Sequence, residues 1–177
     1  MRIISGKYRG RHILPPHTIK ARPTTDFAKE ALFNLLANRI DFEEIDVLDL
    51  FAGTGGISYE FISRGAKSAT CVELANQQQN FIIKTCKELG ISNLTVVRGD
   101  VFKYIKNTDL QFDFVYADPP YALEQLPQIP DLIFSKGLLR KGGLMVLEHS
   151  AANNFQDHPN FIEHRSYGSV NFSFFQL

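Results

Sequence analysis

The sequence lacks any long apolar run. The opening residues, MRIISGKYRG, contain no apolar stretch of signal-peptide length, and no later run approaches the roughly 18 apolar residues that a membrane span needs. These absences argue against a secretory leader and a membrane span, so we expect a soluble, cytoplasmic protein. With 177 residues, 44% of them hydrophobic, the chain can bury the core of one domain, and a second large domain does not fit.

Cysteine is also scarce. The only two, Cys71 and Cys86, fall in separate predicted elements, and no CxxC or Cys/His metal-binding spacing lies near them. This pattern argues against a disulfide framework and against a metal site. We expect two buried free thiols and no metal.

Acidic residues are absent before Asp26. The same segment carries six basic residues: Arg2, Lys7, Arg9, Arg11, Lys20 and Arg22. The net charge of zero therefore combines a basic N-terminal segment with a mildly acidic remainder. Such asymmetry favours a basic arm that binds a polyanion. The alternative is a solvated hairpin that only keeps the protein in solution.

The N-terminal residues predict a small hairpin and a helix. Residues 2–14 contain two β-prone runs around a turn with Gly6 and Gly10, and Pro15-Pro16 ends this element. Apolar residues at helical spacing predict an amphipathic helix over residues 26–39, capped by Thr25 or Asp26. We expect residues 1–24 to form a basic hairpin extension and residues 25–177 a catalytic core.

The rest of the chain alternates short apolar strands with helical segments. Strands are predicted at residues 47–51, 69–72, 94–97, 112–117 and 144–147. Near-continuous apolar strands that alternate with helices indicate a parallel sheet covered on both faces, a doubly wound α/β fold. Residues 161–167 and 170–175 are two further β-rich runs joined by Gly168-Ser169. A connection this short allows only an antiparallel hairpin, so the last strand should be reversed.

A glycine-rich loop follows the first strand of this core. In open α/β sheets ligands bind beyond the carboxyl ends of the strands, and Gly53 and Gly55 let the backbone approach a ligand closely. The loop does not complete a dinucleotide fingerprint, because Ser58 stands where a third glycine or alanine is required. Asp49 would gain nothing beside a pyrophosphate but suits a cation, such as the ammonium of an amino-acid-like ligand. A plain strand-turn-helix is the alternative.

Acids also end the next two strands. Glu73 lies where a carboxylate can accept both hydroxyls of a ribose, about twenty residues after the first glycine. Asp100 could accept the exocyclic amine of an adenine while Val101 packs on the ring. Taken singly, each acid could instead be a surface group or a helix cap. Together the three strand ends describe a pocket for S-adenosylmethionine.

The fourth strand ends in the sequence DPPY, which places Asp118, Pro119, Pro120 and Tyr121 at its tip. The prolines fix the backbone so that the Asp118 carboxylate and the Pro119 carbonyl face outward, and Tyr121 adds a flat ring. Two acceptors beside a stacking face suit a planar heterocycle that bears an NH₂ group. We therefore predict methyl transfer to the exocyclic amine of a nucleobase that has left its stack. A turn that only ends a strand is the alternative.

These motifs, in this order, resemble the class I S-adenosylmethionine-dependent methyltransferases. The opening R-x-I-x-G-x-x-R-G, the segments RPTTD and EALFNLL, the run DLFAGTG and the final DPPY are similar to bacterial 16S ribosomal RNA guanine-N2 methyltransferases of the D type. The resemblance covers nearly the whole chain. It implies a seven-stranded, mostly parallel sheet and N2 methylation of a guanine in the RNA of the small ribosomal subunit, or of an intermediate in its assembly. It also implies an N-terminal extension that helps to hold RNA.

The resemblance also assigns roles to residues. Cofactor-binding roles fall on Asp49, Phe51, Gly53, Gly55, Glu73, Leu74, Asp100 and Val101. Catalytic roles fall on Asp118, Pro119, Pro120 and Tyr121. RNA-binding roles fall on Arg2, Lys7, Arg9, Arg11 and Arg22. The chain departs from the family at Leu74-Ala75, because an aspartate or asparagine more often follows two positions after the glutamate.

Other functions stay open at this point. A DNA methyltransferase acting on adenine N6 or cytosine N4 uses a similar loop, although the chain has no added target-recognition domain. More distant alternatives are an NAD-binding oxidoreductase and a non-catalytic RNA-binding module. The residues leave the oligomeric state open, and we expect a monomer.

Overall fold

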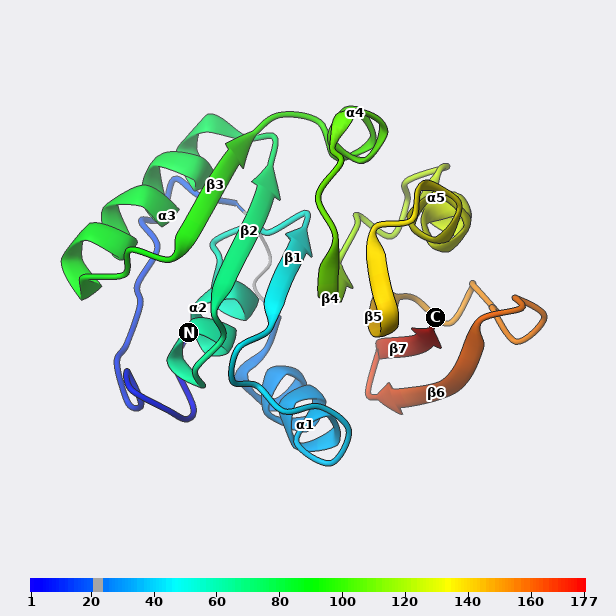
Figure 1. The fold of residues 1–177 in the computed structure, drawn as a ribbon. Helices are drawn as coiled ribbons and strands as arrows, with labels where there is room; N and C mark the ends of the chain where they lie inside the picture. Colours follow the sequence, from blue (N-terminus) through cyan, green and yellow to red (C-terminus); the bar gives the residue numbers. More distant parts are fainter. Residues whose placement is uncertain (21–23) are drawn as a thin grey trace.

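The computed structural model describes residues 1–20 and 24–177. Its centre is a seven-stranded sheet in the order β3-β2-β1-β4-β5-β7-β6 (Figure 1). The strands are β1 (Asp46–Leu50), β2 (Ser68–Glu73), β3 (Leu94–Arg98), β4 (Phe112–Ala117), β5 (Leu139–His149), β6 (Phe161–Tyr167) and β7 (Val170–Gln176). β1 to β5 are parallel, whereas β7 is antiparallel to β5 and to β6. The predicted doubly wound α/β sheet with a reversed last strand is confirmed.

Helices cover both faces of this sheet. They are α1 (Asp26–Leu36), α2 (Gly56–Ser63), α3 (Asn76–Leu89), α4 (Val101–Asn107) and α5 (Ile129–Lys136), with a short 3-10 helix η1 (Leu126–Gln128). α1, α2 and α3 pack on one face, and α4 and α5 on the other (Figure 1). Within the described residues, no helix is both long and apolar enough to cross a membrane.

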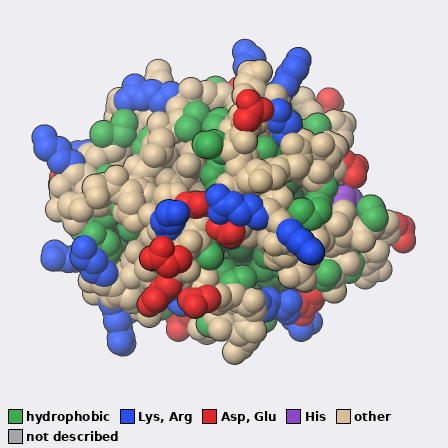
Figure 2. Space-filling model, viewed as in Figure 1, with side chains coloured by type: hydrophobic (Ala, Val, Ile, Leu, Met, Phe, Trp, Pro, Cys, Tyr) green, Lys and Arg blue, Asp and Glu red, His purple; other side chains and the backbone are tan. Residues whose placement is uncertain are grey.

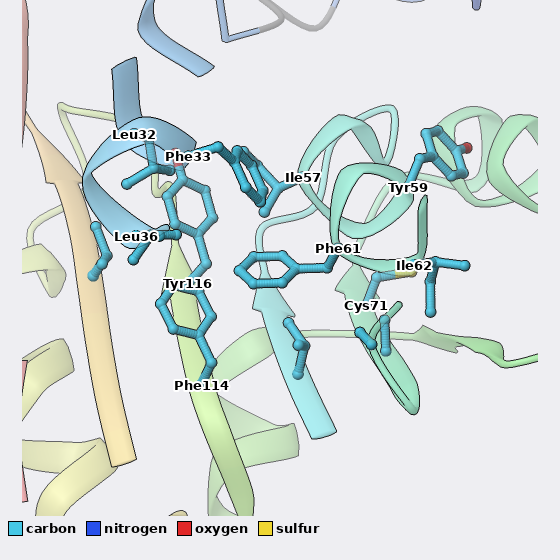
Figure 3. Packing of buried hydrophobic residues seen from close by; sticks show 14 of the residues in the cluster. Leu32, Phe33, Leu36, Ile57, Tyr59, Phe61, Ile62, Cys71, Phe114 and Tyr116 are labelled. Carbon is cyan, nitrogen blue, oxygen red and sulfur yellow. The ribbon is translucent and has the colours of Figure 1, made fainter. Parts of the chain in front are cut away.

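Side chains alternate between the two faces along each strand, as the two-residue period of a strand requires. On β4, Phe114 and Tyr116 point toward α1 and α2, where Phe33 and Phe61 meet them in an aromatic cluster (Figure 3). Phe61 lies 4.7 Å from Phe114 and 4.9 Å from Phe33 between ring centroids. The next residue on β4, Val115, belongs to the core on the opposite face. Both cysteines are buried free thiols in the first of these cores.

α1 is shorter than predicted. The Thr25 hydroxyl caps it by accepting a hydrogen bond from the Ala28 amide at 3.1 Å, which settles the choice between Thr25 and Asp26. The helix ends at Leu36 rather than residue 39. The amides of Asn38 and Arg39 bond to carbonyls three residues back, with Arg39 to Leu36 at 2.9 Å. This tightening of the last turn ends the α-helical geometry while the apolar pattern continues.

The N-terminal hairpin is a looser element than predicted. Its two arms meet in one antiparallel bridge, Arg2 to His12, supported by the Ile3 amide bonding to the Arg11 carbonyl at 3.0 Å. Ile3 and Ile13 are buried, so the element packs against the body of the protein rather than projecting from it. The predicted division into an extension of residues 1–24 and a core of residues 25–177 stays a prediction.

α2 anchors this hairpin. The buried carboxylate of Glu60 accepts hydrogen bonds from the amides of Ile4 at 2.9 Å and Ser5 at 3.0 Å. Gly6 has φ +83°, and a Cβ on it would lie 1.8 Å from the Ser63 carbonyl oxygen. Only glycine therefore allows the hairpin to lie this close to the carboxyl end of α2.

β5 extends further than predicted in both directions, from Leu139 to His149 instead of residues 144–147. Its pairing with β4 shifts register between Phe112 and Phe114, so Lys141-Gly-Gly forms an irregularity inside the strand. At the other end, Ala117 pairs with Leu147, which brings the residues that follow them to the same edge of the sheet.

Candidate active site

A cavity of about 700 Å³ opens at the carboxyl ends of the parallel strands. Four of the acids that line it are Asp49 from β1, Glu73 from β2, Asp100 after β3 and Asp118 after β4. The parallel order of these strands brings residues that are far apart in the sequence to one edge. The cavity is also lined by Phe51, Gly53, Leu74, Val101, Pro119, Pro120 and Tyr121. The sequence had predicted every one of these residues for the site.

Asp49 is a buried acid whose charge costs free energy. Its side chain is only 1% exposed, and burial raises the pKa of its carboxyl to about 7, although a hydrogen bond from Ser58 lowers it. The Ser58 hydroxyl donates that bond to Asp49 Oδ2 at 2.6 Å. A dinucleotide fingerprint needs glycine or alanine at position 58. Here Ser58 occupies it and holds the Asp49 carboxylate by a hydrogen bond. A cationic ligand group beside Asp49 would stabilise its charged form.

Glu73 shapes the glycine loop. Its Oε2 accepts a hydrogen bond from the Gly53 amide at 2.8 Å, and its Oε1 accepts one from the Ala75 amide at 2.8 Å. A carboxylate has about four acceptor positions, so both oxygens can still receive ligand hydroxyls.

Gly55 does not line the cavity. It has φ +84°, and a Cβ on it would lie 2.8 Å from the Tyr59 ring, so packing and turn geometry account for glycine at this position.

Asp100 and Phe51 occupy the third side of the cavity. Asp100 Oδ1 accepts a hydrogen bond from the Lys103 amide at 2.9 Å and so caps α4, while the same side chain lines the cavity. Phe51 has φ +62°, an uncommon backbone conformation for a side chain of this size. Its ring meets the ring of Phe102 edge to face at 6.2 Å. Phe102 also lines the cavity, and the sequence had given no signal for it.

Asp118 begins the DPPY loop. Its amide bonds to the Leu50 carbonyl at 3.2 Å, which ties the loop to β1. Burial raises the pKa of its carboxyl well above the usual range, and the charges of Glu148 and Asp49 raise it further. A hydrogen bond from Thr24 opposes this shift and lowers the pKa. Thr24, from the segment before α1, therefore holds the predicted catalytic acid.

Glu148 is a fifth acid of the cavity, which the sequence analysis missed. It follows Leu147 on β5 and is 5% exposed. Its Oε2 accepts a hydrogen bond from the Tyr116 hydroxyl at 2.6 Å, and its Oε1 accepts one from the Tyr121 hydroxyl at 3.0 Å. Burial and the neighbouring acids raise the pKa of Tyr116, so its hydroxyl remains a donor. The sequence did contain a signal for Glu148, because it follows the predicted apolar strand of residues 144–147, as the other acids follow theirs.

The N-terminal residues supply a further wall of the cavity. Met1, Thr24, Thr25 and Lys29 all line it. The ammonium of Lys29, 2% exposed, donates a hydrogen bond to the Arg2 carbonyl at 2.6 Å and lies 3.6 Å from Glu60 Oε2. Burial lowers the pKa of Lys29, while Glu60 raises it. The start of the chain and the cavity are therefore parts of one packed unit.

The predicted RNA-binding residues lie elsewhere. Arg2, Lys7, Arg9 and Arg11 are exposed, and none of their side chains lines the cavity. Arg22 lies outside the described residues. Figure 2 shows Lys and Arg side chains along the left margin, at the top and in the middle of this face, where they lie beside a group of Asp and Glu side chains. The bases on this face are thus spread out and mixed with acids and do not form one continuous patch.

Comparisons with known proteins identify the family of this chain. The family described as Conserved hypothetical protein 95 matches residues 1–176. A ribosomal RNA small subunit methyltransferase D of Escherichia coli strain K12 is 32% identical over 166 residues, which are 93% of this chain and 83% of that protein. The protein of the same name from Haemophilus influenzae is 33% identical over 152 residues, 84% of this chain and 78% of that protein.

Solved structures share the whole architecture. The Escherichia coli protein yhhF, assigned as a methyltransferase, superposes with a TM-score of 0.87 at 29% identity, over 99% of this chain and 97% of that one. A methyltransferase solved with S-adenosylhomocysteine has the same fold at 19% identity, with a TM-score of 0.64 over 84% of this chain and 49% of that one. The chain belongs to the family described as Conserved hypothetical protein 95, that of the ribosomal RNA small subunit methyltransferases D.

Proposed function

We propose that this protein is an S-adenosylmethionine-dependent methyltransferase that modifies the exocyclic N2 of a guanine in the 16S ribosomal RNA of the small ribosomal subunit. The observation that carries the proposal is one cavity in which Asp49, Glu73 and Asp100 share a space with Asp118 of the DPPY loop. Relatives that are about a third identical over most of their length and named as small-subunit ribosomal RNA methyltransferases support the RNA substrate.

The residues of the cavity fit the cofactor. A volume of about 700 Å³ is that of a pocket for a drug-sized ligand. Asp49 is a buried acid that a ligand ammonium would stabilise in its charged form. Glu73 has acceptor positions for ribose hydroxyls, and Asp100 has one for an exocyclic amine. Leu74, which is 68% exposed, and Val101 supply apolar surface for a purine ring.

The DPPY loop acts on the nucleobase. When bound, S-adenosylmethionine supplies an electrophilic methyl group on a sulfonium. Asp118 and the Pro119 carbonyl accept hydrogen bonds from the N2 amine, which favours the positive charge that develops on nitrogen and contributes about 3 kcal/mol per fixed group. The sulfonium charge of S-adenosylmethionine, which S-adenosylhomocysteine lacks, favours the ionised form of Asp118, which burial otherwise opposes. Tyr121, 38% exposed, takes over the stacking that the base loses when it leaves the RNA.

The partner is 16S ribosomal RNA, presented by the small subunit or by an intermediate in its assembly. The exposed bases Arg2, Lys7, Arg9 and Arg11 supply positive charge for its phosphates. We place the enzyme in the cytoplasm with its substrate and propose that it acts as a monomer.

Labelled methyl transfer tests the proposal. Small subunits from cells that lack this gene should accept one methyl group, recovered as N2-methylguanosine after digestion. Asp118→Ala should lower turnover by about 100- to 1,000-fold, as the loss of one fixed charge-stabilising group does. Its affinity for S-adenosylhomocysteine should stay within a few-fold. Glu124→Gln, an exposed acid in the segment that follows the loop, is the control and should keep full activity.

Two results would contradict the proposal. Methylation of adenine or cytosine in duplex DNA, with none in ribosomal RNA, would indicate a DNA amino-methyltransferase. Full turnover by Asp118→Ala would remove the role that we assign to the DPPY loop.

A further inference from the structure

Glu148 is the neighbour of Asp118 at the edge of the sheet. The register pairs Ala117 of β4 with Leu147 of β5, so the two acids follow paired residues on adjacent parallel strands. Both line the same cavity, and the charge of Glu148 raises the pKa of Asp118. A base whose amine binds Asp118 therefore lies in a cavity that Glu148 also lines.

The Glu148 carboxylate is held in place by two tyrosines. The hydroxyls of Tyr116 and Tyr121 donate to different oxygens of the carboxylate, at 2.6 Å and 3.0 Å. One tyrosine belongs to the buried core of β4 and the other to the DPPY loop. Each carboxylate oxygen can accept more than one hydrogen bond, so a carboxylate that two tyrosines hold in place can also accept one from a ligand.

The chemistry of the bases makes a second fixed acceptor selective. In guanine, the atom next to the N2 amine on the Watson–Crick edge is N1, which carries a hydrogen. In adenine and cytosine, the ring nitrogen next to the exocyclic amine carries a lone pair. A carboxylate beside Asp118 accepts a hydrogen bond from the first arrangement and repels the second. A polar group buried against the wrong partner is among the stronger sources of discrimination in enzymes.

We infer that Glu148 selects guanine by accepting the N1–H hydrogen bond while Asp118 and the Pro119 carbonyl receive the N2 amine. This inference rests on the proposed function and deepens it, because it names the group that distinguishes guanine from the other amino-bearing bases. Tyr116 and Tyr121 position Glu148 for this contact.

A substrate with 2-aminopurine in place of guanine distinguishes a role of Glu148 in base selection from a purely structural role. It keeps the amine at C2 but has a lone pair at N1, so it differs from guanine where Glu148 would act. The substrates are a 16S ribosomal RNA fragment with guanine at the position that the wild-type protein methylates and the same fragment with 2-aminopurine at that position. The wild-type protein should prefer guanine by about 100-fold or more in kcat/KM.

Glu148→Gln should narrow that preference by about tenfold or more, because an amide can turn its NH₂ group toward the lone pair of N1. The rate on guanine falls, and the rate on 2-aminopurine holds or rises. Affinity for S-adenosylhomocysteine and the melting temperature show whether the variant is folded. Glu124→Gln should keep the wild-type preference.

Tyr116→Phe is the second variant, and it tests the selection of guanine by Glu148 if Glu148→Gln does not fold. It keeps the carboxylate but removes the donor to Oε2, so the preference should narrow by a few-fold. An unchanged ratio of guanine to 2-aminopurine rates in the folded variants, even with both rates lowered, would overturn the inference. The proposed function would then still stand, provided that the wild-type protein methylates guanine. The proposed function fails if the wild-type protein does not methylate guanine in the RNA.

Discussion

Cofactor affinity should depend on pH through Asp49. Burial raises the pKa of this carboxyl from 3.8 to about 7, so near neutral pH the empty cavity holds a mixture of its acid and its anion. An ammonium group bound beside Asp49 favours the anion and lowers the pKa again. Binding then releases a proton, and the affinity must rise with pH below the pKa of the free protein.

The size of the effect follows from the two pKa values. With a free-state pKa of about 7 and a bound-state value near 4, affinity for S-adenosylhomocysteine should rise about 25-fold from about pH 5.5 to about pH 7.5. This range ends below the pH at which the amine of the ligand loses its own proton, about 8. At about pH 6, binding should release about 0.9 protons. In the absence of ligand, the free energy of unfolding should fall as pH rises from 3.8 to about 7. In this range the unfolded chain has released the proton of Asp49, whereas the folded protein still holds it.

Calorimetry in two buffers with different ionisation enthalpies measures both the affinity and the number of protons released. Ser58→Ala removes a hydrogen bond to the anion, worth about 1.5–3 kcal/mol or one to two pKa units, so affinity at pH 7 should fall by about 5- to 50-fold. Asp49→Asn should bind weakly with no pH dependence, whereas Asp118→Asn should keep the slope. A flat profile in the wild-type protein, or an equal slope in Asp49→Asn, would refute the reasoning.

Two further predictions concern the N-terminal hairpin. Gly6→Ala should destabilise the protein by about 3 kcal/mol or more in thermal unfolding, because its Cβ would overlap the Ser63 carbonyl. Gly10→Ala is the matched control: φ is +82° but nothing lies within 4 Å, so only the conformational cost of about 1 kcal/mol remains, and equal losses would contradict the steric argument. Replacing Arg9 and Arg11 together with glutamine should lower the slope of log affinity for RNA against log salt concentration by about 1.5. The same exchange at the two exposed lysines of α3 should leave the slope unchanged, and equal effects at both places would exclude a specific role for the hairpin.

The sequence was sufficient to predict the residues at four strand ends because two rules act together. Parallel strands bring their carboxyl ends to one edge, and a buried strand that ends in an acid stands out against its apolar run. Asp49, Glu73 and Asp118 satisfy both rules, because each lies within one residue of the end of a buried strand, whereas Asp100 follows the partly exposed β3 and satisfies only the first. Glu148 satisfies both too, but the predicted strand stopped at residue 147, and nothing local indicates that β5 lies beside β4.

The contacts made by the N-terminal segment could not be predicted in this way. Thr24 bonds to Asp118, and Lys29 bonds to the Arg2 carbonyl, because the start of α1 lies against the cavity. Such contacts depend on the path of a loop through space, which has no periodic signal in the sequence. The same holds for the Gly6 turn, whose need for glycine comes from the Ser63 carbonyl on α2.

These contacts decide which experiment can isolate RNA binding. Met1 and Lys29 line the cofactor cavity, and the Lys29 ammonium bonds to the Arg2 carbonyl and lies beside Glu60. Removal of residues 1–14 would take Met1 from the wall of that cavity and leave the buried charges of Lys29 and Glu60 without the amides and the carbonyl that they now bond. A truncated protein would therefore lose cofactor affinity and stability together with any RNA contact. Only substitutions of exposed side chains such as Arg9, which leave the hairpin backbone in place, can separate the three effects.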